Sequence, residues 1–576
     1  MSKMIISNYE NWFSSIKKSV SPYFHENSSF CMDGFYSCVF KKLNIDNINY
    51  YVEGEDFVYS TGTIIYDGKF GIEALQKLLR DAKTQHIKEL RSKMIGSFAI
   101  VYKIDSLVRC FVDEVHTFSF YYFVQKDRYV LTNSFYNIAK CVGIKLNDYA
   151  LLERGVRRST MSNITPCQGI FKLCAGEYFE VDLLTKSFGV YPIELNQYES
   201  NICTREEYIN CIYESVKNIS SIRSKHIHNY LHFLTGGIDS RLEFAINIFN
   251  NDSIKLGYWM GNDVITNGTA SDLEITKRIA EKYDIPFECF EVSESYSSSI
   301  SNIDSTLCDK YGEYASLYCG NSKWFGIFEN MDNIEYIGFG YLGESLRELS
   351  DLDRSYDREY DLEKFIKEVY CRTGLEKYVF HLDGFYSNIE KELLALKKNK
   401  SKKIDKTEAF CFFTYSRYEA DCIINNFVNL FCYSFPVFGQ KRVADVINAL
   451  DYEWLKDDYV SLSLINRFDK KLLDFSIYSH HRKFVCHKDS LSMKKSFKYV
   501  FFDFMKKKLF NTPIYSILYL KFLHKFIRPK SISNKSIIEY SRDLSKELNV
   551  LKDSLIKMSW PENFKGIVLR PAQPDI

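Results

Sequence analysis

The sequence predicts an α/β protein with two unlike parts, a β-rich first part and a second part in which strands alternate with helices. From about residue 30 to residue 182, short apolar runs are separated by turn residues, a pattern typical of antiparallel strands. From residue 205 the order becomes helix, strand, glycine turn and helix, which predicts a parallel sheet with crossover helices. A chain of 576 residues exceeds one hydrophobic core, so we expect two or more domains.

In the first part, the strands are expected wherever apolar and β-branched residues form short runs. These runs lie at residues 35–41, 49–53, 57–66, 97–104, 107–112, 118–125 and 129–133. One helix is expected at residues 72–83, because Ile72, Leu75, Leu78 and Leu79 recur with helical spacing on one face.

In the second part, a buried strand at residues 230–234 is followed by the turn Gly236-Gly237 and by a helix from Ser240 onward. Strands at 254–259 and 287–292 flank a helix at 272–283, and the chain is chiefly helical after about residue 361. In a parallel sheet of this kind, a ligand binds outside the carboxyl ends of the strands, where the glycine turn is expected.

Residues 235–240 read Thr-Gly-Gly-Ile-Asp-Ser between the expected strand and helix. A glycine turn at a helix N-terminus presents unpaired amides and the positive end of the helix dipole to an anion. Asp239 would repel a bare phosphate, so its presence implies a bridging Mg²⁺ and predicts ATP as the ligand. The loop is not a Walker A loop, since no Gly-Lys-Ser/Thr follows. An ordinary strand-to-helix connection is the alternative.

Composition excludes several classes of protein. The net charge is +1, so global charge gives no argument for nucleic acid as a partner. The 45 Phe and 42 Tyr favour packed cores over disorder. Sixteen cysteines without a Cys-x-x-Cys pair, and no signal peptide, suit reduced thiols in a cytoplasmic protein. Apolar stretches such as 424–438 and 514–527 are interrupted and too short to span a membrane, so we expect a soluble protein.

Several segments, in order along the chain, resemble the asparagine synthetase family, in which a glutaminase domain precedes an ATP-dependent synthetase domain. The loop at 235–240 is similar to the Ser-Gly-Gly-x-Asp-Ser pyrophosphate loop of the N-type ATP pyrophosphatases. The other similar segments are residues 96–99, 111–113, 120–122, 165–170, 175–178, 271–280, 338–344 and 468–473.

The resemblance implies an Ntn-hydrolase-like αββα sandwich over residues 1–200 and a parallel-sheet ATP-pyrophosphatase domain, adenine nucleotide α hydrolase-like, over 201–480. A basic, mainly helical extension is expected over 481–576. The implied activity is that of an AMP-forming amide ligase, which adenylates a carboxylate, releases pyrophosphate and joins the acyl group to ammonia or another amine. Asparagine biosynthesis is one such activity.

The resemblance also implies roles for site residues. Gly236, Gly237 and Ser240 would donate hydrogen bonds to pyrophosphate, and Asp239 would hold Mg²⁺. Lys470 would place a positive charge near the phosphates, or it is a solvated lysine beside Lys471. The remaining members of the expected site are Thr235 and Gly340 at the nucleotide and Glu344 as a second metal ligand, for which a surface helix cap is the alternative.

The sequence departs from the family at the glutaminase positions. Ser2 stands where the nucleophilic cysteine is expected, Ile95 replaces an aspartate, and 62–64 reads Gly-Thr-Ile in place of Asn-Gly-Glu. We therefore expect a first domain without glutamine hydrolysis. The amine would then be free ammonia, ammonia from a separate partner protein, or the amine of a second substrate. At the second metal position, Leu342 or Gly343 stands in place of an aspartate.

Three further interpretations stay open. Arg241 adds charge at the phosphates or points outward from its helix. The basic aromatic strip at 482–530 is a solvated helix face, or a minority contact with an anionic membrane surface or charged carrier. The whole chain is alternatively a catalytically decayed synthetase that serves as a scaffold in a biosynthetic assembly. A tRNA-modifying or NAD-forming pyrophosphatase fits less well, since these lack the β-rich first domain.

Overall fold

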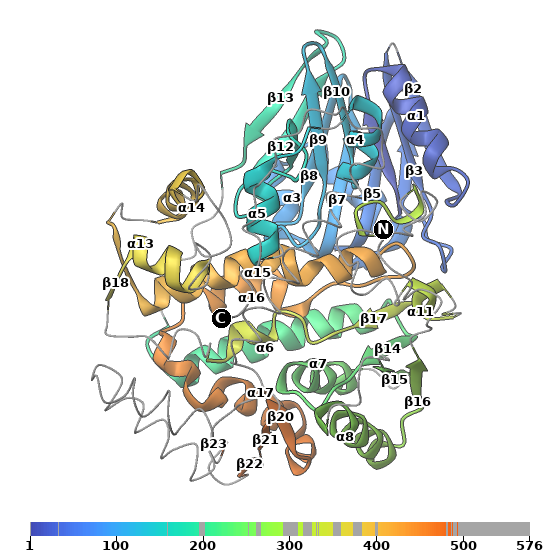
Figure 1. Cartoon of the computed structure of the whole chain (residues 1–576). Helices are drawn as coiled ribbons and strands as arrows, with labels where there is room; N and C mark the ends of the chain where they lie inside the picture. Colours follow the sequence, from blue (N-terminus) through green and yellow to red (C-terminus); the bar gives the residue numbers. More distant parts are fainter. Residues whose placement is uncertain are drawn as a thin grey trace, which may run out of the picture.

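The computed structural model places the β-rich half at one end of the molecule and the parallel sheet at the other (Figure 1). It describes residues 2–194, 202–250, 253–260, 267–291, 309–314, 325–348, 359–371, 383–397 and 401–479, apart from 33, 144, 158, 330 and 332, together with 482–484, 486–487 and 492–493. The expected extension at 481–576 and the strip at 482–530 therefore lie almost wholly outside the described residues.

Two antiparallel sheets form the first half. The first has the order β11-β9-β10-β1-β3-β2 and the second the order β13-β12-β8-β7-β5-β4. The strands of the first sheet are β1 (Met4–Ser7), β2 (Glu26–Met32), β3 (Phe35–Phe40), β9 (Tyr121–Gln125), β10 (Arg128–Thr132) and β11 (Ile170–Lys172). Those of the second are β4 (Tyr50–Glu53), β5 (Asp56–Tyr66), β7 (Met94–Ile104), β8 (Leu107–Val112), β12 (Glu177–Asp182) and β13 (Ser187–Pro192), and the short β6 (Lys69–Phe70) pairs with β5.

The two sheets pack face to face between two layers of helices. Helices α1 (Glu10–Val20) and α4 (Phe135–Val142) share one buried apolar cluster with both sheets. Helices α2 (Gly71–Ala82) and α3 (Ile87–Ser92) bury their apolar faces against the other face of the second sheet. This helix–sheet–sheet–helix order agrees with the expected αββα layering, and its assignment as Ntn-hydrolase-like stays a prediction.

The strands and helix expected in this half are present, with ends shifted by a few residues. The expected strand at 107–112 coincides with β8, and the expected helix at 72–83 is α2. Strand β1 and helix α1 were not expected, although Trp12, Phe13, Ile16 and Val20 are buried with helical spacing. Helix α5 (Asp148–Arg157) completes this half.

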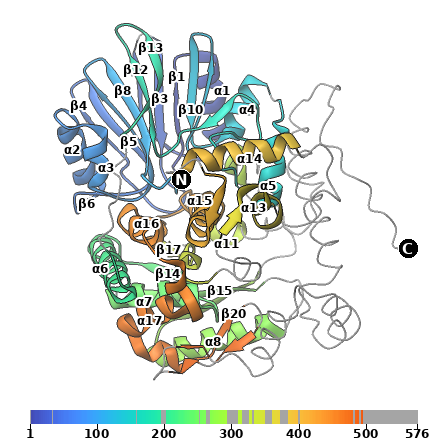
Figure 2. The same cartoon turned by 90° about the vertical axis from the view of Figure 1, so that its left-hand side faces the viewer.

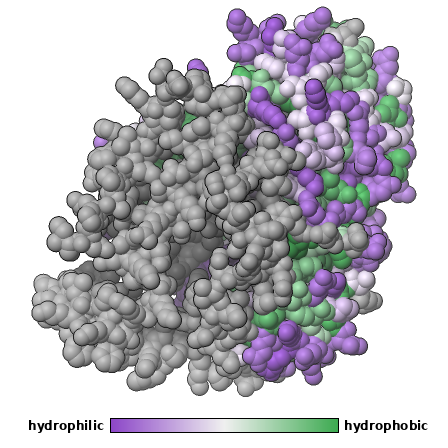
Figure 3. All heavy atoms as spheres, turned by 45° about the vertical axis from the view of Figure 1, so that its right-hand side comes forward, coloured by the Kyte–Doolittle hydropathy of each residue, from purple (hydrophilic) through white to green (hydrophobic). Residues whose placement is uncertain are grey.

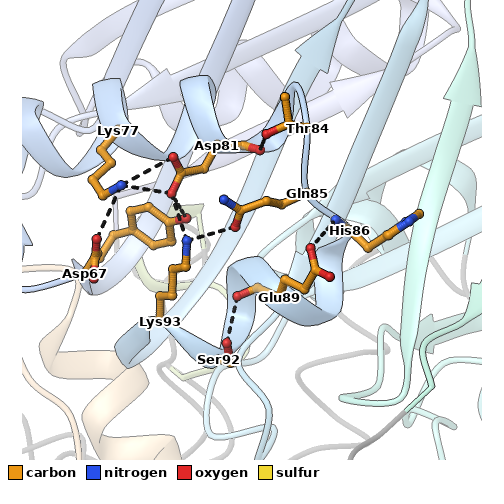
Figure 4. Close-up of polar contacts among 10 residues, drawn as sticks. Asp67, Lys77, Asp81, Thr84, Gln85, His86, Glu89, Ser92 and Lys93 are labelled. Carbon is orange, nitrogen blue, oxygen red and sulfur yellow. Dashed lines mark hydrogen bonds and ion pairs between the residues drawn. The ribbon is translucent and has the colours of Figure 1, made fainter.

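A buried carboxylate fastens α2 to the second sheet (Figure 4). Asp81 accepts hydrogen bonds from the Tyr66 hydroxyl at 2.7 Å and from the ammonium groups of Lys77 and Lys93, each at 3.1 Å. Burial and the neighbouring Asp81 both raise the pKa of Tyr66, so its hydroxyl stays protonated and donates. The cluster links α2 to Tyr66 at the end of β5 and to Lys93 just before β7. We assign it a structural role.

The second half contains the expected parallel sheet, in the order β16-β15-β14-β17. Its strands are β14 (Tyr230–Phe233), β15 (Ile254–Met260), β16 (Phe287–Glu291) and β17 (Tyr336–Gly338), and all neighbours run parallel. Helices α6 (Arg205–Ser224), α7 (Ile238–Phe249), α8 (Asn267–Tyr283) and α17 (Tyr459–Asp469) accompany it (Figure 2). Strand order reverses at β14, which makes its carboxyl end the switch point of the sheet.

Beyond residue 361 the described chain is mainly helical, as expected. It contains α13 (Leu362–Phe365), α14 (Asp383–Leu396), α15 (Lys406–Val428) and α16 (Lys441–Ile447), with the short strand pair β18 (Glu359–Asp361) and β19 (Lys403–Asp405). Helices α15 and α16 lie between the two halves in both views (Figures 1 and 2). The buried apolar cluster runs through them without interruption, so the halves share a core.

On the face shown in Figure 3, the coloured residues are mostly hydrophilic, with hydrophobic areas between them. Leu184, in the turn between β12 and β13, is the most exposed large apolar side chain of the described residues. Across the described ranges, no helix is long and apolar enough to cross a membrane.

Candidate functional site

The loop at 235–240 connects β14 to α7 at the switch point of the parallel sheet. Gly237 is the residue before the helix, with φ −71° and ψ 168°, and Asp239 lies in the first helical turn. The first amides of a helix have no intrahelical acceptor, so they and the helix dipole favour an anion here. A side chain at Gly236 would collide with the Asp272 carboxylate from α8, since an added Cβ would lie 2.3 Å from Oδ1. The expected strand, turn and helix are therefore confirmed.

Two hydroxyl groups hold this loop in shape. The Ser240 hydroxyl accepts a hydrogen bond from the Thr235 amide at 3.1 Å and lies 2.8 Å from the Thr235 hydroxyl. Thr235 Oγ1 in turn accepts from the Gly237 amide at 3.2 Å. The sequence predicted Gly237 and Ser240 as donors to pyrophosphate, but here they bond within the loop. The remaining donors of the loop are the Gly236 amide and the amides of the first helical turn.

The second expected loop, at 338–344, packs directly against the first. An added Cβ at Gly340 would lie 2.3 Å from the Ser240 backbone nitrogen, and one at Gly343 would lie 2.7 Å from Asp239 Cβ. Only glycine allows this approach of two backbones. The loops that follow β14 and β17 therefore meet at the switch point, as the parallel topology requires.

Leu342, at one of the two positions expected for a second metal-binding aspartate, adopts the left-handed conformation with φ 66°. Its side chain is buried and lies against Gly439, where an added Cβ would come within 2.9 Å of Leu342 Cδ1. Glu344 follows in a short 3₁₀ turn (Gly343–Leu346). Arg347 is the next residue after this turn, and its side chain contacts Asp239. Arg347 Nη2 and Asp239 Oδ2 lie 2.8 Å apart, with side-chain exposures of 15% and 18%.

Arg241 is fully buried, so the expectation that it points outward from its helix is wrong, and its effect on bound phosphates stays a prediction. Its guanidinium donates to the carbonyl of Gly236 at 3.2 Å and to those of Leu472, Phe475 and Ser476 at 2.7–3.2 Å. The arginine thus ties the 235–240 loop to the segment after α17. Lys470 begins that segment and is exposed, and no contact between its side chain and the loop is recorded among the described residues. Its role at the phosphates stays a prediction.

The acidic residues Asp239 and Glu344, on the two loops that meet at the switch point, are compatible with a nucleotide-bound magnesium ion. Mg²⁺ in nucleotide sites takes one or two protein carboxylates together with phosphate oxygens and water. Asp239 and Glu344 both act electrostatically on the Arg347 guanidinium, so both carboxylates lie near this arginine. Within the described ranges, no group of three or more His, Cys, Asp or Glu side chains forms a metal cage. These residues could hold magnesium only as part of a metal–nucleotide complex.

A buried polar network lies beneath the loop, and the sequence analysis did not identify it. His232 of β14 donates from Nε2 to the Ser240 carbonyl at 2.8 Å, and its Nδ1 accepts from the Asn247 amide group at 3.1 Å. Burial lowers the pKa of His232 to about 4, so the ring is neutral. Arg223 donates to Asn247 and lies 3.9 Å from the Glu243 carboxylate. Each of these residues is a single polar residue within a mainly apolar stretch, and no local sequence pattern indicates that they lie together in the fold.

In the first half, the segments that the family would use for glutamine bind the second half instead. The Thr63 hydroxyl lies 2.6 Å from Asn429 Oδ1 and accepts from the Ser434 amide at 3.0 Å. The Gly96 amide donates to the Gln440 side chain at 2.7 Å. These hydrogen bonds are buried and join residues from opposite ends of the chain. They agree with the expected loss of glutamine hydrolysis, which stays a prediction.

Ser2, the residue in the position of the family's nucleophile, is 1% exposed. Its carbonyl accepts hydrogen bonds from the Thr61 hydroxyl and from the Asn133 amide group, the latter at 3.0 Å. The adjacent Lys3 is also buried, and burial lowers the pKa of its ammonium group to about 8. Ser2 is thus buried against Thr61 of the second sheet and Asn133, which follows β10 of the first sheet.

A scan of the chain against models of protein families finds no match, and a search of curated proteins finds none. Solved structures give matches of low similarity. Glutamine phosphoribosylpyrophosphate amidotransferase from B. subtilis, complexed with ADP and GMP, matches at 11% identity and a TM-score of 0.24 over 50% of this chain and 65% of that chain. The allosteric regulatory enzyme of purine biosynthesis matches at 9% identity and 0.22, with the same coverage.

Glutamine-dependent NAD⁺ synthetase from Acinetobacter baumannii, in complex with ADP, matches at 18% identity and a TM-score of 0.16 over 28% of this chain and 27% of that chain. The chain thus spans less than two thirds of each of these three solved chains. Similarities at this level do not establish a common fold, so the function is argued below from the residues of the site.

Proposed function

We propose that the chain is an ATP-dependent carboxylate–amine ligase that adenylates a small-molecule carboxylate, releases pyrophosphate and forms an amide. The observation that carries this proposal is the glycine loop at 235–240, which lies at the switch point of a parallel sheet, opens onto the N-terminus of α7 and carries Asp239 in the first turn. A strand, a glycine turn and a helix N-terminus in this arrangement suit a polyphosphate.

The chemistry asks the protein for positioning and for neutralisation of charge. The substrate carboxylate attacks the α-phosphorus of ATP, and the bond to the β-phosphate oxygen breaks as pyrophosphate leaves. The Gly236 amide and the first-turn amides of α7 would stabilise the departing charge. Thr235 and Ser240 keep the loop in the shape that exposes those amides. Magnesium bound with the nucleotide would neutralise phosphate charge, with Asp239 and Glu344 as its protein ligands.

In this proposal, the first half of the chain does not supply the amine by hydrolysing glutamine. Thr63 and Gly96 are engaged by the second half, and Ser2 is buried. Free ammonia, ammonia from a separate partner, or the amine of a second substrate would attack the acyl-adenylate carbonyl and displace AMP.

A non-catalytic scaffold is the second candidate, and one observation favours it. Two amides of the loop already have acceptors inside the loop, and Asp239 is paired with Arg347. A decayed synthetase would keep such a self-satisfied loop and bind no nucleotide.

Calorimetry with Mg-ATP separates the two candidates. The ligase should bind Mg-ATP with a dissociation constant in the micromolar to millimolar range. It should also exchange labelled pyrophosphate into ATP when a carboxylate from a substrate screen is added. A protein that is folded by circular dichroism yet binds no Mg-ATP would exclude the ligase and leave the scaffold.

A further inference from the structure

The ion pair between Arg347 and Asp239 joins the two loops that meet at the switch point. The two side chains come from loops after β17 and β14, and their charged groups lie 2.8 Å apart. The pair is placed by close backbone packing, because Gly340 and Gly343 lie directly against Ser240 and Asp239. Both side chains keep about a sixth of their surface exposed, so the pair is partly accessible to solvent.

A guanidinium can serve two anions at once. It carries five N–H donors in a planar fork, and the nearest contact of Arg347 with Asp239 is made by Nη2. Burial disfavours the charge of Arg347, but Asp239, Glu344 and Asp458 outweigh burial and raise the pKa of the guanidinium. Arginine stays protonated in proteins, so Arg347 carries a permanent positive charge beside Asp239, at the junction of the two loops.

We propose that Arg347 is a polyphosphate-binding residue, held at the mouth of the 235–240 loop by Asp239 so that its remaining N–H groups contact the β- and γ-phosphates of the nucleotide. This inference rests on the proposed nucleotide site and adds a residue to it. Arginine suits phosphate oxygens because its fork matches two oxygens at once. Asp239 then positions Arg347 through the contact between its Oδ2 and Arg347 Nη2.

The test compares nucleotides that differ only in their phosphates. Calorimetry with AMP, Mg-ADP and Mg-ATP is carried out on the full chain and on the variants Arg347→Gln and Arg347→Lys. We expect Arg347→Gln to weaken Mg-ATP binding at least tenfold while AMP binding changes less than twofold. Arg347→Lys, which keeps a charge but loses the fork, should fall between the two. Arg80→Gln, an exposed arginine of α2, is the matched control and should leave all three affinities unchanged.

Two results would overturn the inference and leave the proposed function standing. One is equal binding of Mg-ATP by the original chain and Arg347→Gln. The other is an equal loss of AMP and Mg-ATP binding in that variant, which would show that Arg347 only holds the loops together. If the unaltered chain binds none of the three nucleotides, the proposed function fails and this inference with it. Melting temperatures of all variants confirm that each one is folded.

Discussion

Arg241 shows how one side chain can set the shape of a loop from behind. Its four carbonyl acceptors include Gly236 in the nucleotide loop and three residues of the segment after α17. Because a buried guanidinium without acceptors would be costly, these carbonyls and Arg241 require one another. The residue therefore holds the loop in place through its hydrogen bonds to backbone carbonyls.

Replacing Arg241 should destabilise the protein strongly. Arg241→Ala leaves the carbonyls of Gly236, Phe475 and Ser476 without this donor, and we expect a loss of about 3 kcal/mol in the free energy of unfolding. Urea denaturation measures the change. Arg80→Ala on the exposed side of α2 is the control and should stay within about 0.5 kcal/mol. A loss for Arg241→Ala no larger than this control would contradict the structural role.

Asp239 should matter far more for activity than for stability. Asp239→Ala removes the carboxylate at the helix start, and we expect pyrophosphate exchange to fall at least ~100-fold. The free energy of unfolding should fall by only about 1 kcal/mol, because the pair with Arg347 is partly exposed. Exchange assays and urea denaturation give the two values. Asp46→Ala, at an exposed ion pair with Lys41, is the control and should change neither the exchange rate nor the free energy of unfolding appreciably. Unchanged pyrophosphate exchange in Asp239→Ala would remove Asp239 from the mechanism.

Glu243 should make stability depend on pH. The carboxylate is buried, and neither oxygen has a hydrogen-bond partner among the described residues. Burial raises the pKa of Glu243 to about 8, although Arg223 opposes the shift. The unfolded group titrates near ~4.3, so between about pH 4.5 and 8 the folded state binds more protons than the unfolded state. The free energy of unfolding should therefore fall as pH rises through this window, by up to about 1.4 kcal/mol per pH unit.

Glu243→Gln isolates that contribution, because glutamine has the same shape and does not titrate. Urea denaturation at pH 5, 6, 7 and 8 should give a flatter dependence for Glu243→Gln than for the unaltered chain. Parallel curves for the two proteins would show that Glu243 keeps an ordinary pKa in the folded state.

At the scale of elements, the site depends on two loops from neighbouring parallel strands. The loop after β14 supplies the amides and Asp239, and the loop after β17 supplies Glu344 and Arg347. Their contact is made by backbone atoms, because Gly340 lies against the nitrogen of Ser240. Side chains on either loop are useful only while this contact holds.

Gly340→Ala tests that contact. The new Cβ would lie 2.3 Å from the Ser240 nitrogen and 2.6 Å from the Asp239 carbonyl carbon, and backbone atoms cannot yield as a flexible side chain can. We expect Mg-ATP affinity to fall at least tenfold and the free energy of unfolding to fall by about 1–3 kcal/mol. Gly189→Ala is the control, because its added Cβ would meet only the Tyr191 ring at 3.4 Å. Affinity that survives Gly340→Ala would mean that the loops move independently.

At the scale of the whole molecule, the two halves are joined by buried polar contacts and a shared apolar core. Lys42 donates from its ammonium group to the Asn429 and Cys432 carbonyls at 2.7 and 3.0 Å, and Thr63 bonds to the Asn429 side chain. Asn429 itself donates to the Ser434 carbonyl at 2.7 Å. Such buried polar contacts must all be satisfied together, so they fix how the halves dock.

Asn429→Ala should loosen that docking. It removes the acceptor of Thr63 and the donor to Ser434 from a fully buried position, and we expect a loss of about 2–4 kcal/mol in the free energy of unfolding. Calorimetric melting should then show two transitions in place of one, since each half has its own sheets. Asn11→Ala, on the exposed face of α1, should melt like the unaltered chain. One unshifted transition in Asn429→Ala would show that the halves do not depend on this contact.

The order of the elements and the conformation of the 235–240 loop could be predicted from the sequence, because both depend on local patterns. The apolar alternation of β8, the helical spacing of α2 and the glycine turn after β14 are each contained within a dozen residues. The packing of Gly340 against Ser240 followed only in outline, from the rule that parallel strands bring their following loops together.

By itself, the sequence determined where a glycine turn joins a strand to a helix start, which is the place of the proposed anion site, since these three features are consecutive in the chain. Only the tertiary structure decided which charges surround that site. It buried Arg241 among carbonyls, paired Asp239 with Arg347, placed Glu243 beside Arg223 and bound Thr63 to Asn429. Most of these partners are far apart in the chain, and a charged side chain carries no local pattern that names its distant partner. Those partners are set by which side chains become buried and by how the two halves dock.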